Sequence, residues 1–319
     1  MIRSVLCFFL VVLLSPFSIA ANNHEEDLLR DAQSKADVFG LPSFRLKANV
    51  TIDNDGKPLE GSYTLLWNGP DQWREELVFP GFSEIKVGGK GVVATKRNVD
   101  FTPLRVEQVY QTLSYGHARL LPEPGQQVKR VHDRTVRGTK VECFDIRDKE
   151  RSVNQVCIDP LSGTWLREGF FEDRDIVAIG NKFFPRSLHY VENGKTLVNA
   201  LVTEMITPAE FPAAAFAQPE GAESKAGCMN PKPGRVVKKV PPQYPEGERQ
   251  RRVEGTVSMY ARIAADGTLQ GLRLVSGVSP ALNQASVDAV RQWQYEPYTC
   301  DGVPVEVETV IRVNFSLRQ

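Results

Sequence analysis

From Phe44 to about residue 206, apolar residues recur at every second position, and this period most limits the possible folds. The stretch FRLKANVTI places five apolar side chains on one face of a strand, because successive side chains on a strand point to opposite sides. The turn sequence DNDGK follows, and LEGSYTLLW and QWREELVF continue the alternation. Further strand-like runs lie near residues 83–97, 126–147, 153–168 and 181–206. The pattern predicts a large, mostly antiparallel sheet within residues 22–206.

Two segments of the same region have a helical period instead. HEEDLLRDAQSKADV, residues 24–38, places Leu28, Leu29, Ala32 and Ala36 along one side of a helix. PLRVEQVYQTLSY, which begins at Pro103, is the other helix that the region predicts. An antiparallel sheet with one apolar face needs a cover, and one or two helices can provide it. We therefore expect the α+β fold class.

Composition and charge exclude some classes of function. The chain has 319 residues, of which 41% are hydrophobic and 24% charged, and this favours about two globular domains. Lys and Arg number 39, as do Asp and Glu, so the net charge is zero and we expect no nucleic-acid partner. The sequence has four isolated His (24, 117, 132 and 189) and neither an HExxH nor a GxSxG motif. We expect no enzymatic activity, no cofactor and no metal site.

The N-terminal residues have the layout of an export signal. In MIRSVLCFFLVVLLSPFSIA, Arg3 precedes an apolar run, and small residues follow at Ser18 and Ala20. This predicts a cleaved signal peptide over residues 1–20. The alternative is an uncleaved membrane anchor, because the apolar run of residues 5–21 is near the lower length limit for a spanning helix.

Four cysteines remain after the signal, an even number that fits an oxidising compartment. Cys143 and Cys157 lie in two alternating segments on either side of a charged turn, which is the layout of a bridge across a hairpin. Cys228 would then pair with Cys300. The alternatives are four free thiols or a metal site, but the sequence has no CxxC and no His near a Cys at ligand spacing.

The composition changes after the expected sheet. Residues 207–230, within TPAEFPAAAFAQPEGAESKAGCMNPKPG, are rich in Pro, Ala and Gly and have no hydrophobic period. We predict a linker here, between a domain at 22–206 and a second domain at 231–319.

The second domain is expected to contain a three-stranded antiparallel sheet and two helices. A short helix is predicted after Pro245, followed by the strand TVSMYARI, the turn ADG and the strand TLQGLRLVSG. Ser279 and Pro280 begin a second helix, in which Leu282, Ala285, Ala289 and Trp293 share one side. The chain ends in the strand VEVETVIRVNFSL.

These motifs together resemble the C-terminal domain of the TonB family of energy transducers. They are QYP at 243–245, VEG at 253–255, DG at 266–267, SG at 276–277, WQYEP at 293–297 and the apolar terminal strand. The resemblance implies a periplasmic protein whose edge strand takes up the TonB box, an extended peptide of an outer-membrane transporter, by strand addition. It also implies a contribution to energy-coupled transport and the possibility of a homodimer through exchanged terminal strands.

The resemblance also assigns candidate peptide-binding residues. The edge strand should span residues 306–316, and Gln243 matches the family's box-contacting glutamine. For Gln243 the alternative is a solvated turn residue, and for Tyr244 and Trp293 it is a place in the core. The candidate residues are Gln243, Tyr244, Glu306, Val307, Glu308, Val310, Arg312 and Asn314.

Two family features are missing, and the first domain resembles another fold. The N-terminal apolar run has no His, and no long Pro-rich span follows it, so force transmission from the inner membrane is not implied; an uncleaved segment would anchor the chain there. The sheet with a helical cover resembles the LolA-like lipoprotein-carrier fold, a half-open barrel with an apolar cavity. That resemblance implies a lipid or lipoprotein acyl ligand near Trp67, Trp73, Phe79 and Phe82; the alternative for these aromatics is a plain sheet core.

Overall fold

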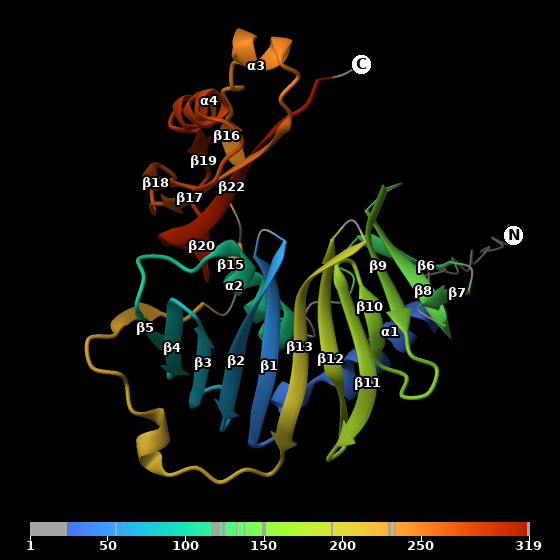
Figure 1. Cartoon of the computed structure of the whole chain (residues 1–319). Helices are drawn as coiled ribbons and strands as arrows, with labels where there is room; N and C mark the ends of the chain where they lie inside the picture. Colours follow the sequence, from blue (N-terminus) through green and yellow to red (C-terminus); the bar gives the residue numbers. More distant parts are fainter. Residues whose placement is uncertain are drawn as a thin grey trace, which may run out of the picture.

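The computed structural model describes residues 24–319 except for 55, 116–121, 123–124, 132, 137, 149–150, 193, 229–230, 233 and 318–319. The expected signal peptide at 1–20 lies outside the described residues, as do the imidazoles of His117 and His132. The two main sheets of the described residues are a large sheet with strands between residues 44 and 226 and a small sheet with strands between residues 255 and 315 (Figure 1). The fold is α+β and mostly antiparallel, as expected.

The large sheet has fourteen strands among the described residues. Two meanders, β1 to β5 and β8 to β13, meet where β1 pairs with β13. The full order is β14-β5-β4-β3-β2-β1-β13-β12-β11-β10-β9-β8-β6, with β7 beside β8. The first meander comprises β1 (Phe44–Asn54), β2 (Lys57–Trp67), β3 (Trp73–Phe79), β4 (Phe82–Gly89) and β5 (Val92–Arg97). The others are β6 (Gln126–Arg130), β7 (Arg134–Val136), β8 (Thr139–Asp148), β9 (Arg151–Ile158), β10 (Trp165–Glu168), β11 (Phe171–Ile179), β12 (Lys182–Glu192) and β13 (Lys195–Ile206).

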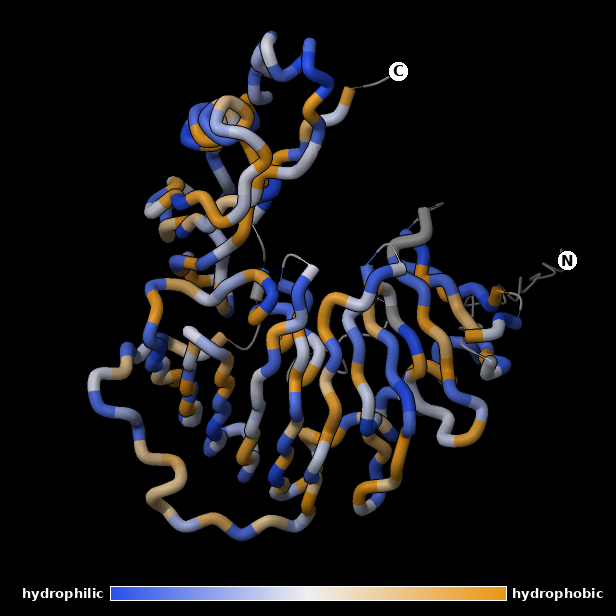
Figure 2. The backbone as a smooth tube through the Cα atoms, in the orientation of Figure 1, coloured by the Kyte–Doolittle hydropathy of each residue, from blue (hydrophilic) through white to orange (hydrophobic). Residues whose placement is uncertain are grey.

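Helices cover one face of the large sheet, behind the strands in the view of Figure 1. Helix α1 (His24–Ala36) packs Leu29, Ala32 and Ala36 against the core of β8, β9 and β10. Helix α2 (Leu104–Tyr110) continues into a π-helical turn, Gln111–Tyr115, and shares a core with β1, β2 and β13. Hydrophilic and hydrophobic residues alternate along these strands in Figure 2, and burial of the apolar set under the helices explains the period of two.

The four aromatic residues considered for a cavity lie in or beside this core. Phe79 and Phe82 are buried in the core, and Trp67 is partly buried against the same core and stacks on Phe44. Trp73 is half-buried and lies over Gly88, where an added Cβ would be 2.0 Å from the indole. These positions match the sheet-core alternative.

The segment expected to be a linker is partly a strand. After β13 the chain passes a short 3-10 turn (Ala213–Phe216) and reaches β14 (Glu223–Ala226), which pairs with β5 and extends the large sheet. An edge strand offers unpaired backbone groups, so a four-residue polar segment can pair with it without burying an apolar side chain. The sequence ESKA has no alternation, and this is why the hydrophobic pattern did not predict the strand.

The small sheet has the expected order of elements. Helix α3 (Glu246–Gln250) precedes β17 (Gly255–Ile263) and β18 (Leu269–Ser276), and α4 (Pro280–Val290) precedes β22 (Val307–Phe315). The strand order is β18-β17-β22, and α4 covers one face, with Leu282 in the core beside Val257 and Met259. Shorter pairs flank it: β15 (Pro231–Lys232), β20 (Thr299–Cys300) and β21 (Val303–Pro304), and β16 (Val236–Lys238) with β19 (Gln294–Tyr295).

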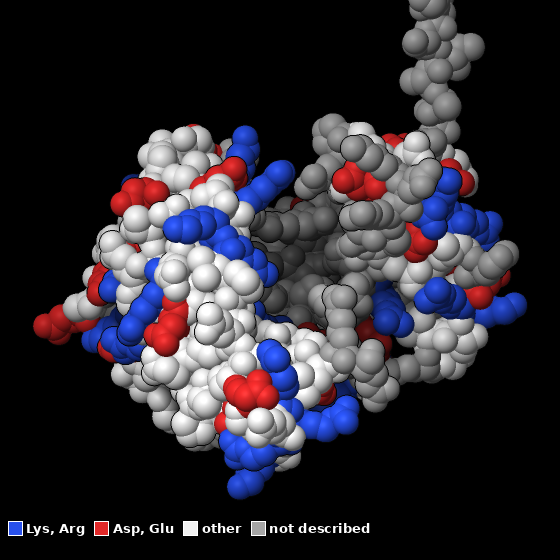
Figure 3. Space-filling view, turned by 90° about the horizontal axis from the view of Figure 1, so that it is seen from above, with Lys and Arg blue, Asp and Glu red and all other residues white. Residues whose placement is uncertain are grey.

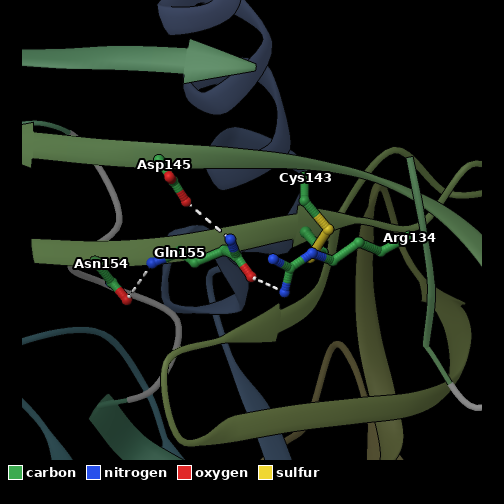
Figure 4. The surroundings of a disulfide bond; sticks show 6 residues. Arg134, Cys143, Asp145, Asn154 and Gln155 are labelled. Atoms are coloured by element: carbon green, nitrogen blue, oxygen red, sulfur yellow. Dashed lines mark hydrogen bonds between the residues drawn. A yellow bond between two sulfur atoms is a disulfide. The ribbon is translucent and has the colours of Figure 1, made fainter. Parts of the chain in front are cut away.

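Two disulfides are present, and they are the pairs that the sequence predicts. Cys143 on β8 lies opposite Cys157 on β9, and the two are bonded across the hairpin. Figure 4 shows the surrounding polar contacts, in which Gln155 donates to Asp145 and accepts from Arg134, both at 2.8 Å. Cys228, two residues after β14, is bonded to Cys300 on β20.

Candidate functional site

Strand β22 is an outer strand of the small sheet. It pairs with β17 over nine residues without a shift in register, and no described strand pairs with its other side. Ile311, Val313 and Phe315 point into the core under α4, whereas Arg312 and Asn314 are exposed on the opposite face. The free side of β22 therefore presents backbone donors and acceptors along a strand without bulges, which is the geometry that accepts an added strand.

The residues expected on the peptide-accepting strand differ in their exposure and in the partners of their side chains. Glu306 is exposed just before β22, and its carboxylate lies 3.8 Å from Arg262 and 3.9 Å from Lys225. Val307 and Val310 are half-buried, and Asn314 accepts a hydrogen bond from Thr256. Glu308 and Arg312 are engaged by residues of the large sheet, a relationship that the sequence does not reveal.

Gln243 and Tyr244 precede α3. Gln243 is exposed, while Tyr244 is half-buried and donates its hydroxyl hydrogen to the Val253 carbonyl. The Tyr244 ring meets Phe315 edge to face, with the ring centroids 5.3 Å apart. Tyr244 thus packs beside the last residue of β22, as the core alternative has it, whereas Gln243 is exposed.

Trp293 is also a core residue. It is buried, and its indole Nε1 donates to the Val240 carbonyl at 2.7 Å. The bond joins the end of the α4 segment to the chain that leads into α3. Trp293 therefore supports the small sheet and is not an exposed contact residue.

A bidentate ion pair connects the two sheets. Arg97, the last residue of β5, donates from both terminal nitrogens to the two carboxylate oxygens of Glu308, at 2.6 and 2.9 Å. Both side chains are partly buried, with 19% of Arg97 and 26% of Glu308 exposed. A second pair joins the same strand to another part of the large sheet, since Arg312 lies 3.7 Å from Glu192 at the end of β12. The face of β22 that lacks a helix is therefore turned towards the large sheet.

The segment after β5 extends this contact across the small sheet. Asp100 pairs with Arg273 on β18 at 2.5 Å, and Phe101 lies on Tyr260 of β17. Beside these contacts is a cleft of about 700 Å³. Its lining includes charged side chains from both sheets, among them Glu84, Lys86, Lys225, Arg262 and Glu308.

The contact changes the acidity of two of its members. Burial by itself would raise the pKa of Glu308, but the hydrogen bonds and charge of Arg97, with the Tyr260 hydroxyl, lower that pKa below its ordinary value. Burial, together with the charge of Glu308, raises the pKa of Tyr260 to about 12. At neutral pH Glu308 is therefore the charged acceptor and Tyr260 a neutral phenol.

Lys and Arg are interspersed with Asp and Glu on the face seen in Figure 3, without an extended area of one sign. Among the described residues, no group of three or more His, Cys, Asp or Glu could hold a metal ion. Of the imidazoles, His24 begins α1, and the buried His189 has Nδ1 3.2 Å from the Glu172 carbonyl oxygen. Over the same described part of the chain, the helices are too short or too polar to cross a bilayer.

The two parts of the chain are similar to different solved structures. The solution structure of the Pseudomonas aeruginosa TonB C-terminal domain is 23% identical, covers 29% of this chain and 95% of that chain, and gives a TM-score of 0.25. A LolA superfamily protein from Nitrosomonas europaea is 11% identical, covers 60% of this chain and 97% of that chain, and gives a TM-score of 0.34.

Sequence comparison identifies the part of the chain that contains β22. The TonB protein of Vibrio cholerae is 34% identical over 112 residues, which are 35% of this chain and 46% of that protein. The chain thus spans about half the length of the curated relative that it matches. The family model described as the Gram-negative bacterial TonB protein C-terminal matches residues 240–317. The small sheet, its helices and the edge strand β22 therefore lie within the residues that match the TonB C-terminal family model.

Proposed function

We propose that the small sheet binds an extended peptide by strand addition along β22, and that the peptide is the TonB box of an outer-membrane transporter. The observation that carries this proposal is the free side of β22 in a domain that matches the TonB C-terminal family. Main-chain hydrogen bonds would supply affinity, and the side chains beside them would supply selectivity. The protein acts in this proposal as a binding partner in energy-coupled transport and not as an enzyme.

The geometry of the small sheet favours β22 over β18 as the accepting edge. The β17–β22 ladder is continuous over nine residue pairs, whereas the β17–β18 ladder has two register shifts. Gly271 in β18 also has a positive φ of 58°. Irregular edges resist pairing with another strand, and a straight edge accepts one. Strand addition should therefore occur beside β22.

We place the protein in the periplasm. The predicted signal over residues 1–20 directs the chain across the inner membrane, and an uncleaved segment would anchor it there. Two disulfides, Cys143–Cys157 and Cys228–Cys300, fit an oxidising compartment. A free β22 edge is also compatible with a homodimer, in which a second copy would occupy the same side of the strand.

An amide NMR titration of the oxidised protein with a TonB-box peptide tests the proposal. We expect shifts concentrated at residues 306–316 and at Gln243, and little change in β18. The control is the same peptide with Pro at alternate positions, since Pro lacks the N–H that a ladder needs. An unchanged spectrum at about millimolar peptide, an affinity weaker than about −4 kcal/mol, would rule out strand addition by free peptides.

The second candidate, a carrier of a lipid or an acyl chain, remains a prediction. The apolar face of the large sheet is covered by α2, whose Val106, Val109 and Tyr110 are buried in the same core as Tyr63. The cleft of about 700 Å³ is lined largely by charged groups, which an acyl chain would not favour. The described residues thus favour the peptide-binding role.

A further inference from the structure

Arg97 is oriented by its own part of the chain. Its guanidinium lies 3.6 Å from the carboxylate of Glu84, which is 1% exposed, and donates to the Thr102 hydroxyl at 3.2 Å. It also donates to the Asp100 carbonyl at 2.8 Å. These partners all lie on β4 or in the segment that leads from β5 to α2. Arg97 would therefore keep its position if the small sheet were removed.

Most of the hydrogen bonds that the Glu308 carboxylate accepts, by contrast, come from Arg97. Its carboxylate receives both guanidinium bonds and one from the Tyr260 hydroxyl. Arg262 lies opposite Glu308 in the β17–β22 ladder, but its guanidinium is 3.8 Å from Glu306. Without Arg97, Glu308 would be a partly buried carboxylate with no cation hydrogen-bonded to it. Such a group would attract another cation.

Glu308 also lies on the strand whose side chains an added peptide strand would contact. In a β-sheet, side chains of directly opposed residues have Cβ atoms about 4.5–5.5 Å apart, so a peptide beside β22 places one side chain next to Glu308. A Lys or Arg at that peptide position would gain an ion pair with a free Glu308. With Arg97 in place, the same cation would meet a carboxylate that is already neutralised and a second positive charge.

We propose that Arg97 determines the charge selectivity of the peptide-accepting strand, by occupying Glu308 and so removing the preference for a cationic peptide residue. This inference rests on the proposed strand addition at β22. It assigns the large sheet a role in recognition, because the residue that changes the charge of the strand comes from β5. Peptides with a neutral residue opposite Glu308 are the partners that fit the intact protein.

The test compares the full-length oxidised protein with Arg97→Gln, using a TonB-box peptide and variants with Lys placed at each position in turn. In the unaltered protein we expect no Lys peptide to exceed the neutral peptide in affinity. In Arg97→Gln, one Lys position should bind about two- to fivefold tighter than the neutral peptide. Adding Glu308→Gln to this variant should abolish the gain.

Arg273→Ala is the matched control, because it removes another ion pair of the same contact without altering Glu308. It should bind all peptides in the pattern of the unaltered protein. If the neutral peptide binds but Arg97→Gln shows no Lys preference, the inference about Arg97 is wrong. If no peptide binds any form, the proposed function itself fails. Arg97→Ala provides a second variant should Arg97→Gln not fold, and the same Lys preference is expected of it.

Discussion

The ring of Phe101 lies on the ring of Tyr260, with the centroids 4.7 Å apart and the planes inclined by 26°. Phe101 belongs to the segment between β5 and α2, and Tyr260 belongs to the central strand of the small sheet. Tyr260 is buried although it lies on the sheet face that has no helix. The N-terminal part of the chain therefore covers this face, and on the adjacent strand β22 Glu308 is paired with Arg97 of β5.

Phe101→Ala should loosen the contact between the sheets. Stacked aromatic pairs contribute about 0.5–1.5 kcal/mol beyond the area that they bury. We expect faster amide hydrogen exchange in β17 and β22, measured by mass spectrometry. The matched control is Phe211→Ala, which removes another aromatic pair, with Phe216, from the connecting segment. Equal exchange in β17 for the two variants would contradict a specific role for Phe101.

The contact between the sheets should weaken in acid. The contact between the sheets lowers the pKa of Glu308, so forming the contact releases protons from this group. The contact is therefore favoured above the ordinary pKa of Glu, about 4.3. The stabilisation is lost as the pH falls from that value through the lowered pKa. We expect amide shifts of residues 307–311 to change between about pH 4.3 and lower values. Glu308→Gln should remove this pH dependence, and its persistence in that variant would assign it to another group.

The two disulfides should have separable effects. Cys143–Cys157 closes a loop with a sequence separation of 14, and its replacement by two Ser should cost about 3 kcal/mol. The loss should appear as a lower denaturant midpoint for the large sheet, with the small sheet unchanged. A lower midpoint in both sheets would mean that the hairpin also supports the C-terminal domain.

Cys228–Cys300 should control how closely the small sheet is held. Cys228 is only two residues beyond Ala226, which β14 fixes to the large sheet. The bond therefore links β20 to the edge of the large sheet through a very short segment. This link raises the effective concentration of the small sheet at the large sheet. Replacing Cys228 and Cys300 by Ser should speed amide exchange at residues 299–304 and in β17. The Cys143–Cys157 variant serves as the control and should leave these amides unaltered.

Gly267 should tolerate substitution less well than Gly302. Both have a positive φ, +83° and +82°, so Ala at either position should cost about 1–2 kcal/mol of backbone strain. A Cβ at Gly267 would also be 2.0 Å from the Tyr295 carbonyl oxygen, whereas at Gly302 it would meet nothing within 4 Å. Chemical denaturation should show a loss for Gly267→Ala that exceeds the loss for Gly302→Ala by at least about 1 kcal/mol. Equal losses would mean that the turn shifts away from Tyr295.

Much of the fold follows from local pattern. The period of two in FRLKANVTI predicts β1, and burial of Phe44, Leu46 and Val50 in the core that the sheet shares with α2 accounts for it. The two alternating segments around the charged turn predict the Cys143–Cys157 hairpin. In contrast, the polar sequence of β14 gives no signal, because its pairing depends on a free edge that another part of the chain provides.

The candidate site divides in the same way. The resemblance of about residues 231–319 to the TonB family indicates β22 and its neighbours, and alternation indicates which β22 residues enter the core. Neither the resemblance nor the alternation indicates that Glu308 and Arg312 pair with residues of the large sheet. Neither indicates that Tyr244 packs on Phe315.

By itself, the sequence determined the period of the main strands, the order of helices and strands in the C-terminal region, the cysteine pairs and the resemblance of that region to the TonB family. Only the tertiary structure decided which residues meet across the two sheets. Arg97 and Glu308 are 211 positions apart in the sequence. Taken alone, Arg97 is an ordinary charged residue at the end of one strand, and Glu308 is one within another. The physical reason is that periodicity reports whether a side chain is buried against its own sheet, whereas a contact between sheets depends on how the chain connects and orients them.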